Sequence, residues 1–322
     1  MTLQIGSLSL ASPYVLAPMA SLTDVAFRCL VSEMGGVGLL ITEMISAEGL
    51  LRRNQRTMEM IRNSNDTTPV FIQLFGENPD AMAEAARMVA AETGFDGIDI
   101  NMGCPAGKVI RKGAGAALMK DPAKAAKIVA AARHAAPDLP LTVKMRLGFD
   151  RVNAPVFLEA IQAEGVDAVI VHFRLQCHRY RVPADWSHAG SLRHIARVPL
   201  VGNGDVMTEA DARMRLAQVD GVMIGRGAIM DPLIFHRLAG GNGSVDLEER
   251  VIPRLLELIE THYPEPMRLG RLKALTRFLV SGRHMSRRYR QAIYTATTYA
   301  QGARNLLALA DRLINGHGAA QT

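Results

Sequence analysis

The sequence predicts an α/β fold: a (β/α)8 TIM barrel followed by a small C-terminal α-helical domain. Eight short apolar runs recur along the first 240 residues, segments with helical patterning alternate with them, and helical periodicity continues after a Gly-rich stretch at 238–244. The count of eight, and the lack of a G-x-G-x-x-G motif after the first run, favour a closed barrel over an open doubly wound sheet. We expect the barrel to cover residues 1–240 and the helical domain to cover residues 246–322.

The apolar runs have the length and continuity of parallel strands that are buried on both faces. We expect strands at 13–17, 37–41, 70–74, 95–100, 141–145, 168–171, 199–201 and 221–224. In the barrel, helices are expected at 78–92, with Asn78 as N-cap and Pro79 in the first turn, and at 121–135, 153–164 and 208–217. The helical domain is expected to hold helices at 247–262, 268–281, 287–299 and 303–314, with a break at 264–266 and a disordered tail from 316.

The composition is that of an ordinary globular protein with ample core: 322 residues, 48% hydrophobic and 21% charged. A net charge of +6 suggests an anionic partner. The three cysteines Cys29, Cys104 and Cys177 are widely spaced, which argues against disulfides and for a reducing compartment. We see no metal-binding pattern, signal peptide or membrane-spanning run, and therefore expect a monomeric cytoplasmic protein without a metal.

A lone cysteine stands in a polar, Gly-rich loop directly after the fourth expected strand, in the stretch Asp99-Ile-Asn-Met-Gly-Cys-Pro-Ala-Gly-Lys108. Pro105 fixes the backbone after Cys104, and the glycines allow close approach by another group. A cysteine at the carboxyl end of a strand can serve as a nucleophile or as an acid. The alternative is a buried structural cysteine.

Other polar side chains also end apolar strands, and in a barrel these ends meet on one face. They are Gln73, Asn101, Lys144, Arg146, His172, Arg174, Asn203, Asp205 and Arg226, and apolar Met19 stands at the end of the first strand. Each alone has a structural explanation, but their convergence indicates an active site, because polar groups are costly in a core. The loops Asn203-Gly204-Asp205 and Gly225-Arg226-Gly227 follow the last two strands, where phosphate sites of such barrels are often built.

Basic residues crowd together in the expected helical domain. They are Arg268, Arg271, Lys273, Arg277, Arg283, Arg287, Arg288 and Arg290, with Tyr289 among them. This pattern is typical either of a solvated helix face or of a surface that contacts nucleic-acid phosphates.

Taken together, five motifs resemble the tRNA-dihydrouridine synthase family, of the bacterial, FMN-dependent type. They are Ala17-Pro18-Met19-Ala20, Asn101-Met102-Gly103-Cys104-Pro105, Lys144-Met145-Arg146-Leu147-Gly148 and the two phosphate-loop triplets. The resemblance runs from about residue 16 to 236 and continues more weakly through Arg271 and Lys273. It implies an enzyme that uses FMN and NADPH to reduce uridines in tRNA to dihydrouridine, with hydride delivered to uracil C6.

The resemblance also implies roles for individual residues. Pro18, Met19 and Ala20 would line the flavin, Gln73, Lys144 and His172 would face its ring, and Asn203, Gly204, Asp205, Gly225 and Arg226 would hold its phosphate. Cys104 would protonate C5 of the uracil, as a thiol with a pKa near neutrality can. Asn101, Arg146, Arg174, Arg271 and Lys273 would bind the substrate.

The sequence departs from the family after the sixth strand, where His-Gly-Arg-Thr is usual and this chain has His172-Phe173-Arg174-Leu175. A glycine there lets backbone approach the flavin or its phosphate, so we expect Phe173 to affect that site. Two alternatives remain open at this point. One is an FMN-dependent reductase of small molecules, which would share the barrel and the phosphate loops, and the other is an RNA-binding relative without catalytic activity, in which Phe173 has spoiled the flavin site.

Overall fold

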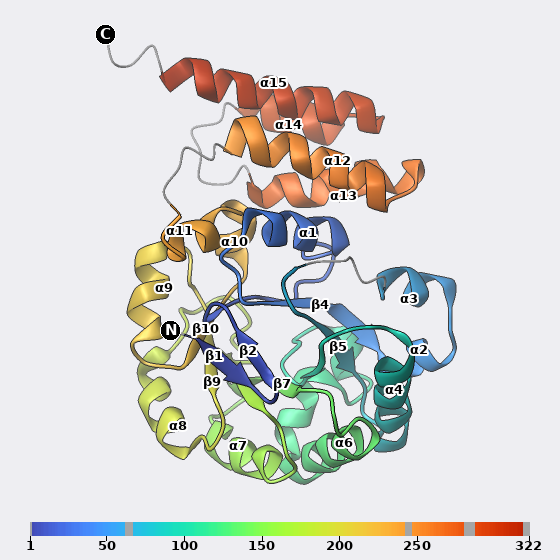
Figure 1. Cartoon of the computed structure of the whole chain (residues 1–322), viewed down its shortest axis with the longest axis vertical. Helices are drawn as coiled ribbons and strands as arrows, with labels where there is room; N and C mark the ends of the chain where they lie inside the picture. The colour runs from blue at the N-terminus through green and yellow to red at the C-terminus, as the bar shows by residue number, and fades with distance from the viewer. Residues whose placement is uncertain (1, 62–66, 242–246, 280–286, 318–322) are drawn as a thin grey trace.

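Eight parallel strands close into a barrel in the order β10-β3-β4-β5-β6-β7-β8-β9 (Figure 1). The computed structural model describes the chain except for residues 1, 62–66, 242–246, 280–286 and 318–322. The strands are β3 (Tyr14–Leu16), β4 (Leu39–Ser46), β5 (Val70–Phe75), β6 (Gly97–Asn101), β7 (Leu141–Gly148), β8 (Ala168–Leu175), β9 (Leu200–Asn203) and β10 (Gly221–Ile224). All eight predicted strands are present, and the barrel is confirmed. Strands β4, β7 and β8 extend further than expected through polar residues, because neighbouring strands satisfy their backbone groups.

Helices between the strands cover the outside of the barrel (Figure 1). They are α1 (Val25–Met34), α2 (Ala47–Leu51), α3 (Gln55–Met60), α4 (Pro79–Glu92), α5 (Gly107–Ile110), η1 (Gly115–Lys120), α6 (Pro122–Ala135), α7 (Ala154–Gln162), η2 (Trp186–His188), α8 (Ala189–Ile195), α9 (Glu209–Leu216), α10 (Arg226–Met230) and α11 (Ile234–Leu238). The predicted cap of α4 is confirmed, since the Asn78 side chain accepts hydrogen bonds from the backbone N–H groups of Asp80 and Ala81. Helices α4, α6, α7 and α9 were predicted, whereas α1 and the shorter helical segments were not.

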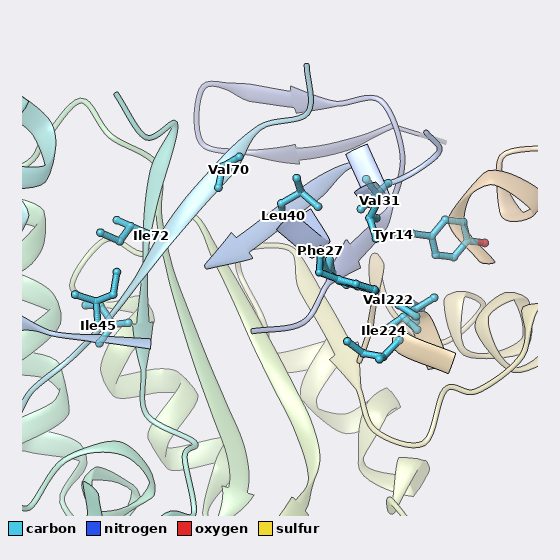
Figure 2. Close-up of a cluster of buried hydrophobic side chains, with 14 of the residues drawn as sticks. Tyr14, Phe27, Val31, Leu40, Ile45, Val70, Ile72, Val222 and Ile224 are labelled. Carbon is cyan, nitrogen blue, oxygen red and sulfur yellow. The ribbon is translucent and has the colours of Figure 1, made fainter. Parts of the chain in front are cut away.

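Two apolar layers hold the barrel together. Outward-facing strand residues pack under the helices, and Figure 2 shows Leu40, Ile72 and Val222 of the strands in the same cluster as Phe27 and Val31 of α1. The second layer fills the barrel at the amino ends of the strands. An unpredicted antiparallel hairpin, β1 (Leu3–Ile5) and β2 (Leu8–Leu10), contributes its buried side chains to this inner layer.

The last helices lie together on one side of the barrel, next to α1, α10 and α11 (Figure 1). They are η3 (Leu247–Val251, a π-helical turn), α12 (Ile252–His262), α13 (Glu265–Leu279), α14 (Arg287–Thr295) and α15 (Tyr299–His317). An ion pair between Arg254 and Glu33, 2.7 Å long, joins α12 to α1. The division of the chain into two domains at 240–246 stays a prediction.

Among the C-terminal helices, several boundaries differ from the sequence-based expectation. Helix α13 begins at Glu265, because Pro266 fits a first turn whose N–H groups have no intrahelical partner. Tyr299 begins α15 rather than ending the preceding helix, with the Thr298 hydroxyl accepting from the N–H of Gln301 at 3.2 Å. Helix α15 continues to His317, and the rest of the expected tail, like residues 242–244 of the Gly-rich stretch, lies outside the described residues. Within the described part of the chain, no helix combines the length and hydrophobicity that a membrane span requires.

Candidate active site

The carboxyl ends of the barrel strands surround a cavity of about 470 Å³. This volume lies in the range of small-molecule and cofactor sites. The cavity wall includes every barrel residue that was predicted for the site: Pro18, Met19, Ala20, Gln73, Asn101, Cys104, Lys144, Arg146, His172, Arg174, Asn203, Gly204, Asp205, Gly225 and Arg226. The polar strand ends therefore do converge.

Strand pleating decides which side chains reach the cavity, because alternate residues of a strand face opposite sides. On β8, Ile170 lies in the inner apolar layer, while His172 and Arg174 line the cavity. Phe173, between them, faces the outer layer and packs against Trp186 with ring centroids 4.4 Å apart. Phe173 therefore does not line the cavity, and its expected effect on the flavin site stays a prediction.

Gly202 on β9 makes room for these two outer rings. A Cβ atom at this position would come within 2.5 Å of the Trp186 ring and 3.1 Å of Phe173. Leu175 also packs against the outer layer and does not line the cavity. Both departures from the family pattern are thus accommodated outside the barrel.

The Cys104 loop is held by hydrogen bonds from three elements. The Asn101 side-chain oxygen accepts from the backbone N–H groups of Cys104 at 2.9 Å and Gly103 at 3.2 Å. Arg146 on β7 donates through Nε to the carbonyl oxygen of Gly103 at 2.7 Å, and Ala116 N–H donates to the carbonyl oxygen of Cys104 at 3.1 Å. These contacts fix the loop backbone and hence the base of the thiol side chain.

The Cys104 thiol is partly buried, and burial raises its pKa above the ordinary value. A backbone hydrogen bond from Ala106 and the charges of Arg146 and Lys144 act in the opposite direction. The structure therefore contradicts the expected pKa near neutrality. A thiol in this environment keeps its proton at pH 7 and is suited to donating it.

A fully buried carboxylate, Asp99, lies on β6 beneath the cavity. Its Oδ1 accepts from the Thr142 hydroxyl at 2.6 Å, and its Oδ2 accepts from Nε2 of Gln73 at 2.7 Å. Burial raises the pKa of Asp99 to about 6, although both hydrogen bonds and the charge of Lys144 favour ionisation. Burial also lowers the pKa of Lys144 to about 8, helped by the neighbouring charge of Arg146.

Four cationic side chains surround His172, which is buried and neutral. Burial and the charges of Lys144, Arg146, Arg174 and Arg226 hold its pKa well below the usual value. Nη1 of Arg174 lies 3.2 Å from Nε2 of His172. A guanidinium only donates, so Nε2 accepts and the ring proton resides on Nδ1.

Asp205 orients two of these cations. Its carboxylate pairs with Arg174 and, at 2.8 Å, with Nη2 of Arg226. Exposed Tyr180 lies over both groups, with its ring centroid 5.7 Å and 5.3 Å from the two guanidinium carbons. The cavity therefore presents an excess of positive charge, which is suited to an anionic ligand. Among the described side chains, no cluster of His, Cys, Asp or Glu could hold a metal ion.

A family model described as Dihydrouridine synthase (Dus) matches residues 15–314. A protein named "Probable tRNA-dihydrouridine synthase" from Mycobacterium tuberculosis is 40% identical over 275 residues, which cover 81% of this chain and 70% of that one. A protein of the same name from Rickettsia bellii is 36% identical over 273 residues, 81% of each chain. The chain belongs to the dihydrouridine synthase family. The family consists of oxidoreductases, so the chain is an enzyme, and the proposed resemblance is confirmed.

Solved structures with low sequence identity share the barrel fold. A variant of NCR from Zymomonas mobilis is 16% identical with a TM-score of 0.53, covering 86% of this chain and 97% of that chain. DHODH from Eimeria tenella, solved in complex with ferulenol, is 14% identical with a TM-score of 0.52, covering 81% and 84%.

Two residues predicted to bind substrate lie away from the cavity and have partners inside the protein. Arg271 on α13 lies 3.5 Å from the buried carboxylate of Asp24, the N-cap of α1. Lys273 donates to the carbonyl oxygen of Ala296 at 2.7 Å. Both side chains therefore contribute to packing of the helices, and their contact with substrate stays a prediction.

The other basic residues of the C-terminal helices are likewise only partly free to contact a substrate. Arg268 donates to the carbonyl oxygens of Tyr263 and Glu260 at the end of α12, whereas Arg277 is exposed. Arg283 lies outside the described residues, and of residues 287–290 only the helical backbone is described.

Several residues of the site were not predicted from the sequence, among them Asp99, Tyr180 and Phe278. Asp99 stands within an apolar run, and Tyr180 lies beyond a strand end. Phe278, on α13, lines the cavity from the C-terminal helices. A carboxylate between two isoleucines of an apolar strand was the signal that could have identified Asp99, because such a group is costly to bury without a purpose.

Proposed function

We propose that this chain is an FMN- and NADPH-dependent tRNA-dihydrouridine synthase that reduces uridine to 5,6-dihydrouridine. The observation that carries the proposal is a single cavity holding Cys104, Asn101 and Lys144 together with the Asn203–Asp205 loop and Arg226. The names of the matching relatives support tRNA as the substrate.

The residues present fit FMN. Arg226, oriented by Asp205, supplies a cation for a phosphate, and the Gln73 and Asn101 amides and the Lys144 ammonium can bind a polar ring edge. Pro18 and Met19 offer an apolar wall for the ring faces. When bound and reduced by NADPH, FMN supplies the hydride that is added to uracil C6.

Cys104 then provides the proton for C5 of the uracil. Its raised pKa keeps the thiol protonated before the reaction, and the charges of Arg146 and Lys144 stabilise the thiolate afterwards. Asn101 holds both the loop and, in this proposal, the uracil. The proton donor and the residue that orients the base are thus fixed to each other.

An exposed basic group lies next to the cysteine loop. Lys108, Arg111 and Lys112 come from α5 and its C-terminal end, a few residues after Cys104. Such a group can contact phosphates on either side of a base that has left its stack. This exposed group adds to the basic residues of the C-terminal helices.

A cytoplasmic, monomeric state of the protein stays a prediction.

The test is a Cys104→Ala variant assayed anaerobically with FMN, NADPH and a tRNA transcript that lacks dihydrouridine. We expect the variant to bind FMN normally and to form dihydrouridine, measured by mass spectrometry, about 10²–10⁴-fold more slowly. Cys177→Ser is the matched control, because this second free cysteine is exposed and lies outside the cavity wall.

Other outcomes would point elsewhere. Loss of FMN on Cys104→Ala would make Cys104 structural. A wild-type flavin that NADPH reduces, and that a small enone but not tRNA reoxidises, would indicate a small-molecule reductase. A protein that binds tRNA but never binds FMN would indicate a non-catalytic relative.

A further inference from the structure

A chain of hydrogen bonds links buried Asp99 to the cysteine loop through two side-chain amides. Asp99 Oδ2 accepts from Nε2 of Gln73 at 2.7 Å, and Oε1 of Gln73 accepts from Nδ2 of Asn101 at 2.8 Å. Oδ1 of Asn101 then accepts from the N–H groups of Gly103 and Cys104. Asp99 itself does not line the cavity. It therefore reaches the reaction only through other residues.

The direction of this chain is set at both ends. An ionised carboxylate can only accept, so Gln73 must turn its NH2 group toward Asp99 and its oxygen toward Asn101. A backbone N–H can only donate, so Asn101 must turn its oxygen toward Cys104. Each amide thus has one orientation that satisfies both neighbours. A reversed Asn101 would place its NH2 group against two N–H donors and release the loop.

The surroundings of Asp99 hold it in place for this purpose. The Thr142 hydroxyl donates to its other oxygen at 2.6 Å, and the Gln73 backbone N–H is bound by the Thr42 hydroxyl at 2.9 Å. A buried carboxylate costs far more than a buried apolar side chain of similar size, so packing alone does not account for Asp99. Ordering of the amides does account for it.

We propose that Asp99 is a positioning residue that orients the Gln73 and Asn101 amides and thereby fixes the backbone of the Cys104 loop. Its effect on catalysis rests on the proposed function, in which Cys104 donates the proton. Its effect on the loop does not depend on the proposed function.

The loop is tested on FMN-free protein carrying Cys177→Ser, so that Cys104 is the more accessible of the two remaining thiols. Asp99→Leu removes the acceptor at similar volume. We expect amide hydrogen exchange at Gly103 and Cys104 to become about tenfold faster, and the rate of Cys104 alkylation to change about fivefold. Gln73→Met breaks the hydrogen-bond chain one step later without removing a charge, and we expect it to have the same effects. It keeps the proposal testable if Asp99→Leu does not fold.

Two variants serve as controls. Asp99→Asn can still accept from Gln73 while giving its NH2 to the Thr142 hydroxyl, so we expect rescue to within about twofold of wild-type exchange. Asp96→Asn alters an exposed carboxylate just before the amino end of the same strand, which accepts from Val70 N–H at 2.8 Å. It should leave exchange at Gly103 and Cys104 unchanged.

Unchanged exchange and alkylation in folded Asp99→Leu and Gln73→Met would overturn the proposal, because Asn101 would then hold the loop unaided. If the chain is a synthase, Asp99→Leu lowers kcat about a hundredfold with KM for tRNA nearly constant, and Asp99→Asn restores most of it. If wild-type protein fails to reduce tRNA, the proposed function fails, while exchange still decides the role of Asp99.

Discussion

The two halves of the barrel interior use the same strands in opposite ways. At the amino ends, inward-facing Val15, Leu39 and Phe71 belong to a closely packed apolar cluster. At the carboxyl ends the inward positions hold polar groups: Lys144 lines the cavity and donates to Asn203, and Asp99 lies beneath it and accepts from Gln73. On β5 the change occurs between Phe71 and Gln73, one pleat apart. We call the interior at the amino ends of the strands the lower half, and the interior at their carboxyl ends the upper half. We infer that the lower half supplies stability, and that the upper half holds charges in an arrangement that would be unfavourable without a ligand.

The largest effect is expected in the lower half. The Phe71 ring is fully buried over Gly97, where a Cβ would come within 2.5 Å of it. Phe71→Ala should lower the free energy of unfolding by about 3–5 kcal/mol, measured by chemical denaturation, because it leaves a cavity. The folded variant should keep its affinity for FMN. Loss of FMN binding at full folding would show that the two halves do not act separately.

In the upper half, Lys144→Met should impair activity without lowering stability. It removes a partly buried cation that hydrogen-bonds Asn203 at 3.2 Å, and replaces it with a side chain of similar length. We expect dihydrouridine formation to fall about a hundredfold, while the unfolding free energy stays equal or rises, since a buried charge is costly. Steady-state rates and denaturation curves on the same preparation check both. A clear loss of stability would contradict the division between the halves.

A smaller effect is expected on β8, where a substitution on the outer face should change stability but not FMN affinity. Phe173→Leu alters the outer layer against Trp186 and should cost about 1–2 kcal/mol of stability. FMN affinity, measured by fluorescence quenching, should stay within about twofold of wild type. A larger change in affinity would mean that Phe173 shapes the cavity despite facing away from it.

The smallest effect concerns pH. Burial lowers the pKa of Lys144 to about 8, so the ammonium is present below that pH and is lost above it. FMN affinity should therefore weaken by about fivefold as pH rises from 7 to 9, because a charged hydrogen bond becomes a neutral one. Lys144→Met should flatten this profile. An equally steep profile in the variant would assign the titration to another group.

The cavity wall was largely predictable from the sequence because barrel geometry brings the carboxyl ends of all strands to one face. Gln73 and Lys144 stand near the carboxyl ends of apolar runs and Asn203 directly follows one, so no knowledge of their partners was needed to place them there. The roles of Arg271 and Lys273 were harder to predict. A basic residue on a helix looks the same in sequence whether it faces solvent or a buried carboxylate such as Asp24.

The sequence by itself determined the eight-stranded barrel, the face on which the site lies and the family, since these follow from local hydrophobic patterns and short motifs. Only the tertiary structure decided that Phe173 faces outward, that the Cys104 thiol has a raised pKa, and that Asp99 orders the amides beneath the cavity. These features depend on contacts between residues far apart in the chain, and on exclusion of water by several elements at once. Neither leaves a periodic signal in the sequence.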